Sequence, residues 1–406
     1  MGAALCLTLL PIPAVSGAAG TIHILSDGKD LGALLEQSIV QDGDTIRLSG
    51  TGYVSDRQGD GAPWVIEKQV TIEGGTLVLE AGGMVLGADV VLDQVVLSCS
   101  NPVRSVLAAN GYTLTLNGCR QAVQPVHLFC GTLLSSSGQI GSVVLPPPGE
   151  KGTIVVTGTG VELGNLYAGD LVTDAVTEDV IHTSGLAAEI IVSGTGRIGR
   201  AFADDSRQIG AGIYASGAVQ ATRTDCPPVP YPRIPATGGV SIHLRSDSVS
   251  MVHGDTGAAR HAALHCTGQT APLSLHQLDS ITLHPGEREQ TRLTMQAGSC
   301  PGADSQWTIP ADTVLDLRQM GAVTAGTLKG GGTIELDVTG SLTVSGEMTG
   351  RTTLAIGAPG PEGELPEGPY LVAERAQEES FILLPAAVST DTKSLRLTVW
   401  ADRHTL

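Results

Sequence analysis

The chain has 406 residues, a formal net charge of −18 and 3% aromatic residues. The charge argues against nucleic acid and anionic membrane surfaces as partners, since both are bound through cationic contacts. Few aromatic residues together with 53 glycines favour a thin, repetitive core of aliphatic and β-branched side chains over an ordinary globular core.

Residues 1–18 are typical of a secretory leader. The segment from Leu5 to Val15 is apolar, and Ser16-Gly17-Ala18 supplies small residues for cleavage, although no basic residue precedes the apolar run. We therefore predict a secreted or cell-surface protein, with a buried N-terminal strand as the alternative for this segment. No later apolar run is long enough to span a bilayer, so we expect no membrane insertion of the mature chain.

A strand at 21–25 and a short helix at 30–39 come next. Asp30 is a candidate N-cap for the helix. Four apolar residues share one helical face: Leu31, Leu34, Leu35 and Ile39. We expect this helix to cover the N-terminal end of the fold.

The segment 44–116 contains short apolar strands closed by glycine or charged residues. They lie at 44–48, 64–67, 70–73, 76–80, 90–92 and 113–116. Equivalent apolar positions recur at Ile46, Ile72, Leu92 and Leu114, with separations of 26, 20 and 22 residues. This spacing is about one turn of a parallel β-helix, in which each coil buries its apolar side against the next. A β-sandwich is the competing fold, but it usually shows hairpin dipeptides and clean polar alternation.

The middle of the chain carries a longer repeat. Residues 156–160 (VTGTG) match residues 192–196 (VSGTG) at an offset of 36. A second unit recurs as HLFCG (127–131), NLYAG (165–169), RAFAD (200–204), GIYAS (212–216) and, more weakly, SMVHG (250–254). Prolines exclude 145–152 and 226–239 from a central strand, so we predict loop insertions there.

Regular spacing returns near residue 311. Leu315, Ile334 and Leu354 are separated by 19 and 20 residues. The predicted parallel β-helix therefore extends over 19–356, and we expect 357–406 to form strands that cap its C-terminal end, because exposed strand edges need covering. The six cysteines after the leader are too sparse for a disulfide scaffold; buried thiols, or one or two disulfides, are the alternatives.

Several of these stretches resemble a known family: 42–56, 62–97, VHLFCG, NLYAG and 328–356. They are similar to the right-handed β-helix modules near the N-termini of large secreted or cell-surface proteins of Gram-positive gut bacteria. That family is similar in fold to pectate lyases and autotransporter passengers. The resemblance implies an all-β, right-handed parallel β-helix and an extracellular location. Its motifs are structural, so it implies no catalytic residues.

Two catalytic interpretations centre on one region. Pectin hydrolases of this fold use an Asp pair, a His-Gly step and a later Arg-Ile-Lys; Asp204-Asp205 and His253-Gly254 occur in that order here, but the Arg-Ile-Lys does not. A lyase needs a basic residue and usually carboxylates that bind Ca²⁺. Here Arg197, Arg200 and Arg207 would supply the base, and the two aspartates would supply the carboxylates. Turn aspartates in a solvated loop are the simpler interpretation of the same residues.

Six of the ten histidines lie between His243 and His284. His261 and His265 are four residues apart with Cys266 next, a spacing that binds metal on a helix. In a strand, His261 and His265 would share one face and Cys266 the other, which favours stacking over metal binding. We therefore expect no metal and no cofactor.

We interpret the chain as a non-catalytic extracellular or cell-surface module, structural or adhesive, with a glycan or a surface protein as its partner. The alternative is a polysaccharide-degrading enzyme, a lyase or a glycoside hydrolase, on the same scaffold. A protease with a β-helix stalk would need a catalytic domain that the sequence does not show.

Overall fold

The computed structural model describes residues 20–55, 62–80, 82–99, 106–122, 126–135, 145, 147–173, 183–199, 212–219, 229–235, 238–254, 262–268, 271–287, 289–337, 341–350, 352–357 and 381–385. The predicted leader 1–18 and most of the predicted C-terminal cap 357–406 lie outside these residues. The described part is an all-β protein with long parallel sheets and one short helix. No helix within it is long and apolar enough to cross a membrane.

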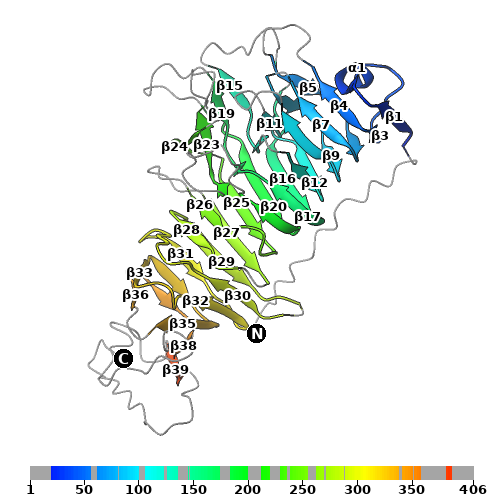
Figure 1. Cartoon of the computed structure of the whole chain (residues 1–406). Coiled ribbons are helices and arrows are strands. Elements are labelled where there is room, and N and C mark those ends of the chain that lie inside the picture. Colours follow the sequence, from blue (N-terminus) through cyan, green and yellow to red (C-terminus); the bar gives the residue numbers. More distant parts are fainter. Residues whose placement is uncertain are drawn as a thin grey trace, which may run out of the picture.

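The largest sheet, called here the long sheet, has thirteen strands that follow chain order from one end of the molecule to the other (Figure 1). All its neighbouring strands are parallel. Its strands are β1 (Ile22–Ser26), β3 (Thr45–Ser49), β6 (Val70–Glu73), β9 (Val90–Asp93), β12 (Thr113–Asn117), β16 (Lys151–Thr157), β20 (Ala187–Val192), β25 (Val240–Leu244), β27 (Ala262–Thr267), β29 (Ser280–His284), β31 (Gln306–Thr308), β34 (Thr327–Lys329) and β37 (Met348–Thr349).

Two further parallel sheets accompany it. The second sheet contains β2 (Lys29–Asp30), β4 (Thr51–Val54), β7 (Thr76–Leu79), β10 (Val96–Cys99), β13 (Arg120–Gln121), β17 (Thr159–Leu163) and β21 (Thr195–Ile198). The third sheet contains β5 (Trp64–Ile66), β8 (Met84–Leu86), β11 (Val106–Ala108), β14 (His127–Phe129), β18 (Leu166–Tyr167), β22 (Ile213–Tyr214), β26 (Met251–His253) and β28 (Ser274–His276).

Three smaller sheets complete the described part. A flanking sheet follows the third sheet and contains β15 (Leu133–Ser135), β19 (Leu171–Thr173), β23 (Ser216–Val219) and β24 (Val229–Pro235). A C-terminal sheet contains β30 (Thr291–Thr294), β32 (Thr313–Asp316), β35 (Thr333–Asp337), β38 (Thr352–Gly357) and β39 (Phe381–Pro385). A two-stranded sheet pairs β33 (Ala322–Ala325) with β36 (Ser341–Val344).

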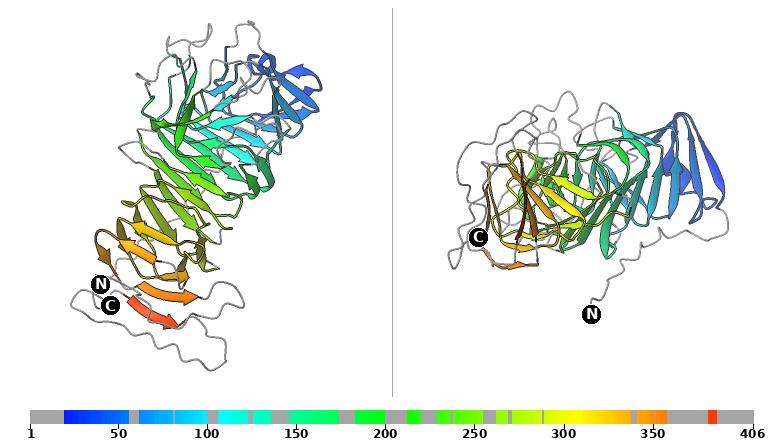
Figure 2. Two further views of the ribbon diagram at one scale, coloured as in Figure 1. Left: turned by 60° about the vertical axis from the view of Figure 1, so that its left-hand side comes forward. Right: turned by 90° about the horizontal axis from the view of Figure 1, so that it is seen from below.

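The chain visits the first three sheets in turn. From β3 it passes through β4 and β5 and returns to the long sheet at β6, and the same cycle runs from β6 to β9 and from β9 to β12. Figure 2 shows these layers from two more directions, succeeding one another from the blue to the orange end. The arrangement is compatible with the predicted β-helix, whereas the antiparallel β-sandwich alternative is wrong, because the paired strands are parallel everywhere in the described sheets except at β23–β24.

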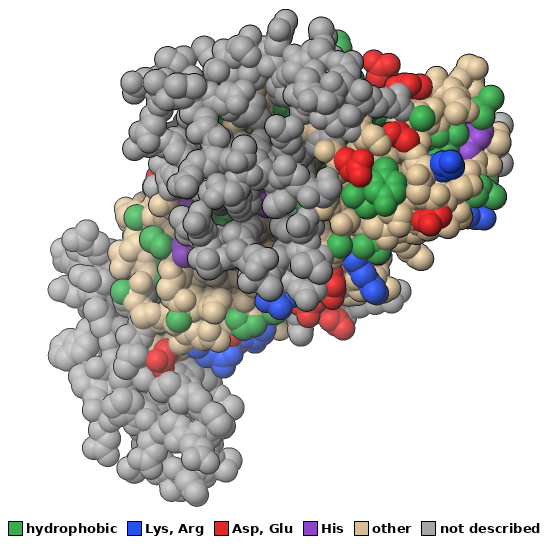
Figure 3. Space-filling view, turned by 45° about the horizontal axis from the view of Figure 1, so that its top comes forward, with side chains coloured by type: hydrophobic (Ala, Val, Ile, Leu, Met, Phe, Trp, Pro, Cys, Tyr) green, Lys and Arg blue, Asp and Glu red, His purple; other side chains and the backbone are tan. Residues whose placement is uncertain are grey.

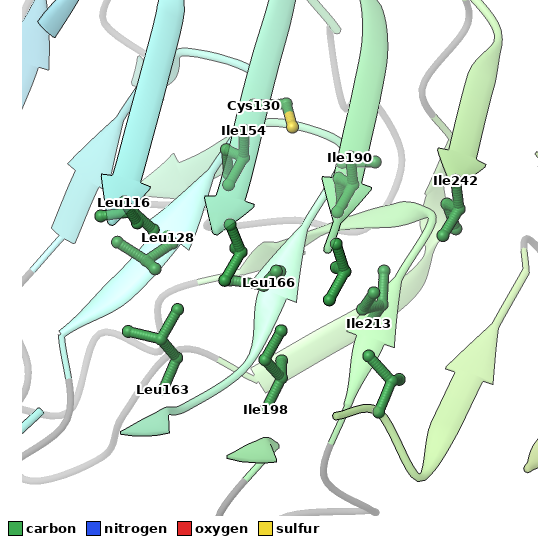
Figure 4. Packing of buried hydrophobic residues seen from close by; sticks show 14 of the residues in the cluster. Leu116, Leu128, Cys130, Ile154, Leu163, Leu166, Ile190, Ile198, Ile213 and Ile242 are labelled. Atoms are coloured by element: carbon green, nitrogen blue, oxygen red, sulfur yellow. The ribbon is translucent and has the colours of Figure 1, made fainter. Parts of the chain in front are cut away.

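The interior is lined by stacked aliphatic residues of the three main sheets. Figure 4 shows Ile154, Ile190 and Ile242 of the long sheet facing Leu128 and other residues of the third sheet. These side chains are fully buried. Because neighbouring strands are parallel and in register, equivalent residues of successive strands lie directly beside one another.

The predicted apolar ladders are confirmed with one correction. Ile46 pairs with Ile72, and Ile72 with Leu92, all fully buried. Leu92 then pairs with Leu116 and not with the predicted Leu114, which is buried beside Val90 instead. Both leucines point inward because they are two residues apart in one strand.

The C-terminal ladder is also in register. Leu315 pairs with Ile334 and Ile334 with Leu354, in the C-terminal sheet and not in the long sheet. Leu315 and Ile334 are buried. The predicted spacing near 20 residues is therefore a real pairing distance at both ends of the described part.

The N-terminal helix is shorter than predicted. Helix α1 spans Leu31–Leu35, and the side chain of Asp30 accepts a hydrogen bond from the Ala33 N–H at 2.8 Å, so the predicted N-cap is confirmed. The prediction that Ile39 lies on the buried face is wrong, because its side chain is 59% exposed. With five residues the helix buries Leu31 and Leu35, and a role in covering the end of the fold is not supported.

The proline-rich segments are partly strands. Lys151 already begins β16, and residues 229–235 form β24, which pairs antiparallel with β23 at the edge of the flanking sheet. An edge position leaves the proline nitrogen without an obligatory partner, so proline is tolerated there. Within the predicted insertion 226–239, residues 229–235 therefore form an edge strand, and no central strand runs through the described part of it.

Candidate functional site

The structure describes only some of the predicted site residues. Asp204, Asp205 and His261 lie outside the described residues, so the hydrolase set and the His261–His265 metal pair are not tested. His253 ends β26 of the third sheet, His265 lies in β27 of the long sheet, and Arg197 lies exposed in β21 of the second sheet. Arg200 and Arg207 also lie outside the described residues, so the lyase set is not tested either.

His253 belongs to a stack of rings on the third sheet, called here the aromatic ladder: Phe129, Tyr167, Tyr214, His253 and His276. Successive ring centroids are 4.7, 5.4, 5.9 and 5.5 Å apart, with interplanar angles of 10–28°. The five residues pair in register on consecutive strands. The recurring units HLFCG, NLYAG, GIYAS and SMVHG thus lie side by side, and each contributes one ring.

The ladder is buried at one end and half-exposed at the other. Phe129, Tyr167 and Tyr214 pack with Leu133 and Leu171 of the flanking sheet in a second hydrophobic cluster. Burial raises the pKa of Tyr214 to about 12. The half-buried end consists of His253 and His276, and burial, aided by the charge of His253, lowers the pKa of His276.

The aromatic ladder does not form a sugar-stacking platform along its length. Aromatic–sugar contacts use the ring face, but in a ladder each face is covered by the next ring and only edges point outward. His253 Nδ1 lies 2.8 Å from the Gly254 carbonyl oxygen, so Nδ1 donates and carries the hydrogen. Among the described residues no ion pair joins His253 to a carboxylate, and glycoside hydrolysis needs a pair of carboxylates.

A second ring stack, called here the imidazole row, runs along the outer face of the long sheet and contains His243, His265 and His284. The centroids of His243 and His265 are 4.6 Å apart, and those of His265 and His284 are 5.3 Å apart. Nδ1 of His265 lies 3.1 Å from Nε2 of His284. Cys266 points the other way into the core, so the predicted division of faces between His265 and Cys266 is confirmed.

Charged side chains continue the imidazole row. Glu189 Oε1 lies 3.3 Å from His243 Nε2, and Glu189 Oε2 lies 2.5 Å from Lys151 Nζ. These hydrogen bonds, from His243 first, lower the pKa of Glu189 to about 2. Burial, followed by the charges of His243 and His284, lowers the pKa of His265 to about 4.

Sequence reasoning missed His243 and His284 as neighbours of His265. The signal was present in the spacing, because 243 to 265 is 22 residues and 265 to 284 is 19 residues. These separations match the coil period read from the aliphatic residues, so outward-facing residues at that spacing are expected to stack.

A third histidine position is unusual because its ring is fully buried and makes no hydrogen bond. His127 in β14 is fully buried beside Tyr167, and neither of its ring nitrogens has a hydrogen-bond partner. Burial lowers its pKa to about 4. The imidazole is therefore neutral at physiological pH, and it was not among the predicted site residues.

The described cysteines are thiols. Cys99 is buried, Cys119, Cys130 and Cys266 are buried free thiols, and Cys300 is exposed. Burial raises the pKa of Cys119 and of Cys266 to about 12, so these thiols are not nucleophiles near neutral pH. Buried thiols are found at Cys119, Cys130 and Cys266, and Cys226 lies outside the described residues.

The described residues contain no group of three or more His, Cys, Asp or Glu side chains that could hold a metal ion. On the described part of the face in Figure 3, acidic and basic side chains lie in small groups of mixed sign. Comparisons with family models, with curated proteins and with solved structures each give no match. The fold defines the class, an all-β protein with long parallel sheets.

Proposed function

We propose that the chain is a right-handed parallel β-helix that acts as a non-catalytic extracellular or cell-surface module. Its role is structural or adhesive, and its partner is a glycan or a surface protein. The observation that carries the proposal is the continuous long sheet of thirteen strands, to which the chain returns with each repeat. The right-handedness of the β-helix and its family rest on the sequence resemblance. The extracellular location rests on the resemblance and on the leader-like residues 1–18.

The physical properties of such a sheet suit a spacer. With neighbouring strands about 4.8 Å apart, thirteen strands extend over roughly 60 Å. Each strand is held mainly by its two neighbours, so length is gained by repetition without a larger core. The outward-facing ladders then present the same side-chain type at a regular interval, which suits a repetitive partner such as a polysaccharide.

An activity assay separates this proposal from the polysaccharide-degrading alternative. Full-length protein is incubated with pectin, polygalacturonate and alginate, with and without Ca²⁺, and reducing ends and unsaturated uronates are measured. We expect no release, because a chain of net charge −18 repels polyuronates. Release that is lost in Asp204→Ala or Asp205→Ala, with an unchanged circular dichroism spectrum, would replace the module by an enzyme.

Binding and shape are tested on the same material. A glycan array and pull-downs with bacterial and host surface fractions are expected to identify a retained partner. Small-angle scattering is expected to give an elongated particle. A compact particle that binds neither class of partner would contradict the proposal.

A further inference from the structure

We propose that His265 and His284 form a two-histidine site for a divalent transition-metal ion on the outer face of the long sheet. The ion is of the class that prefers imidazole, namely Cu²⁺, Ni²⁺ or Zn²⁺, and water completes its coordination. The site is independent of the proposed module function, because it depends only on the local geometry of β27 and β29.

The distance between the facing nitrogens fits a shared metal ion. Nδ1 of His265 and Nε2 of His284 are 3.1 Å apart. An ion about 2.0–2.1 Å from both nitrogens would subtend an angle of about 98° between them, which lies between the cis angle of a square or octahedral site and the tetrahedral angle. The two nitrogens therefore already have the separation of two neighbouring ligands of one ion.

The fold holds the pair in place. β27 and β29 are parallel neighbours, with Thr267 opposite His284. The ring of His265 is stacked between those of His243 and His284. In the free protein one facing nitrogen donates its hydrogen to the other. On metal binding that ring carries its hydrogen on its second nitrogen, so both facing nitrogens present a lone pair.

The local charges select the kind of ion. Both imidazoles are neutral near pH 7, because burial lowers the pKa of His265 to about 4 and lowers that of His284. Glu189 lies behind His243 and favours a cation, whereas its partner Lys151 and the nearby Arg245 oppose one. Hard cations such as Ca²⁺ and Mg²⁺ prefer oxygen ligands and gain little here, so the site favours ions that bind nitrogen strongly.

The experiment titrates the full-length chain with Cu²⁺, Ni²⁺, Zn²⁺ and Ca²⁺ near pH 7.5 by calorimetry. The variants are His265→Gln and His284→Gln, and the matched control is His276→Gln, a half-buried stacked histidine on the third sheet. We expect Cu²⁺ to bind most tightly, each site variant to weaken its binding by about tenfold or more, and the control to leave it unchanged.

A second measurement uses the wild-type protein alone and so does not depend on the folding of any variant. Zn²⁺ is expected to protect His265 and His284, but not His276, from diethyl pyrocarbonate in a mass-spectrometric footprint. The electron paramagnetic resonance spectrum of the Cu²⁺ form is expected to show two coordinated nitrogens. Binding that is equal in His265→Gln and the control, no binding at all, or equal labelling with and without Zn²⁺ would overturn the proposal.

Discussion

Replacing His127 by leucine is expected to make the protein more resistant to acid. His127 is fully buried, and neither ring nitrogen has a hydrogen-bond partner. Burial lowers its pKa from 6.5 to about 4. Between these two pH values the unfolded chain binds a proton at this position and the folded chain does not, so the free energy of unfolding falls as the pH falls through this window.

The size of the effect follows from the shift. A difference of about 2.5 pKa units at roughly 1.4 kcal/mol each gives about 3.5 kcal/mol, most of which the wild type loses between pH 6.5 and pH 4. His127→Leu abolishes this loss because leucine does not titrate. It also removes buried polar atoms without partners, which cost about 1–3 kcal/mol, so we expect a gain in stability at neutral pH as well.

The assay is urea denaturation followed by circular dichroism near pH 7.5 and near pH 4.5. The difference between the two midpoints is expected to be clearly smaller in His127→Leu than in the wild type. Leu128→Met is the matched control, because it changes a buried residue of the same strand at nearly constant volume and adds no titrating group. If His127→Leu and the wild type lose the same stability on acidification, the linkage argument is wrong.

Three further predictions concern other parts of the chain. Lys68→Met removes the hydrogen bonds from Nζ to three main-chain oxygens at 2.7–3.0 Å. We expect the free energy of unfolding to fall by about 2–3 kcal/mol and the amides of residues 31–40 to exchange hydrogen faster. Unchanged exchange in these residues would contradict the prediction. Compared with the wild type, native Cys300→Ser protein should have one reactive thiol fewer towards Ellman's reagent, whereas native Cys266→Ser protein should have the same number, since Cys300 is exposed and Cys266 is buried. An equal decrease in both variants would refute this. Secreted material should begin near Ala19, and recovery of Met1 by N-terminal sequencing would count against a cleaved leader.

The candidate site was only partly predictable. The recurring units, each with one ring, indicated that NLYAG, GIYAS and SMVHG are equivalent, and the structure places Tyr167, Tyr214 and His253 in one ladder. The burial of His127 could not be predicted in the same way. It depends on tertiary contacts such as the one with Tyr167, which comes from the next strand of the third sheet.

Local pattern by itself determined the strand-rich fold and the coil period, because an inward-facing residue must recur whenever the chain returns to the same sheet. The pairing of strands in the tertiary structure decided which inward-facing residues become neighbours, because the coil period alone does not fix the register. Leu114 and Leu116 both face inward, and only the register with β9 selects Leu116 as the partner of Leu92. The helix pattern continued to Ile39, but Lys68 from a later strand connection binds the main-chain oxygens of Leu35 and Val40, and the helix ends at Leu35. A sequence specifies which side chains recur, whereas contacts between distant segments decide which of them meet.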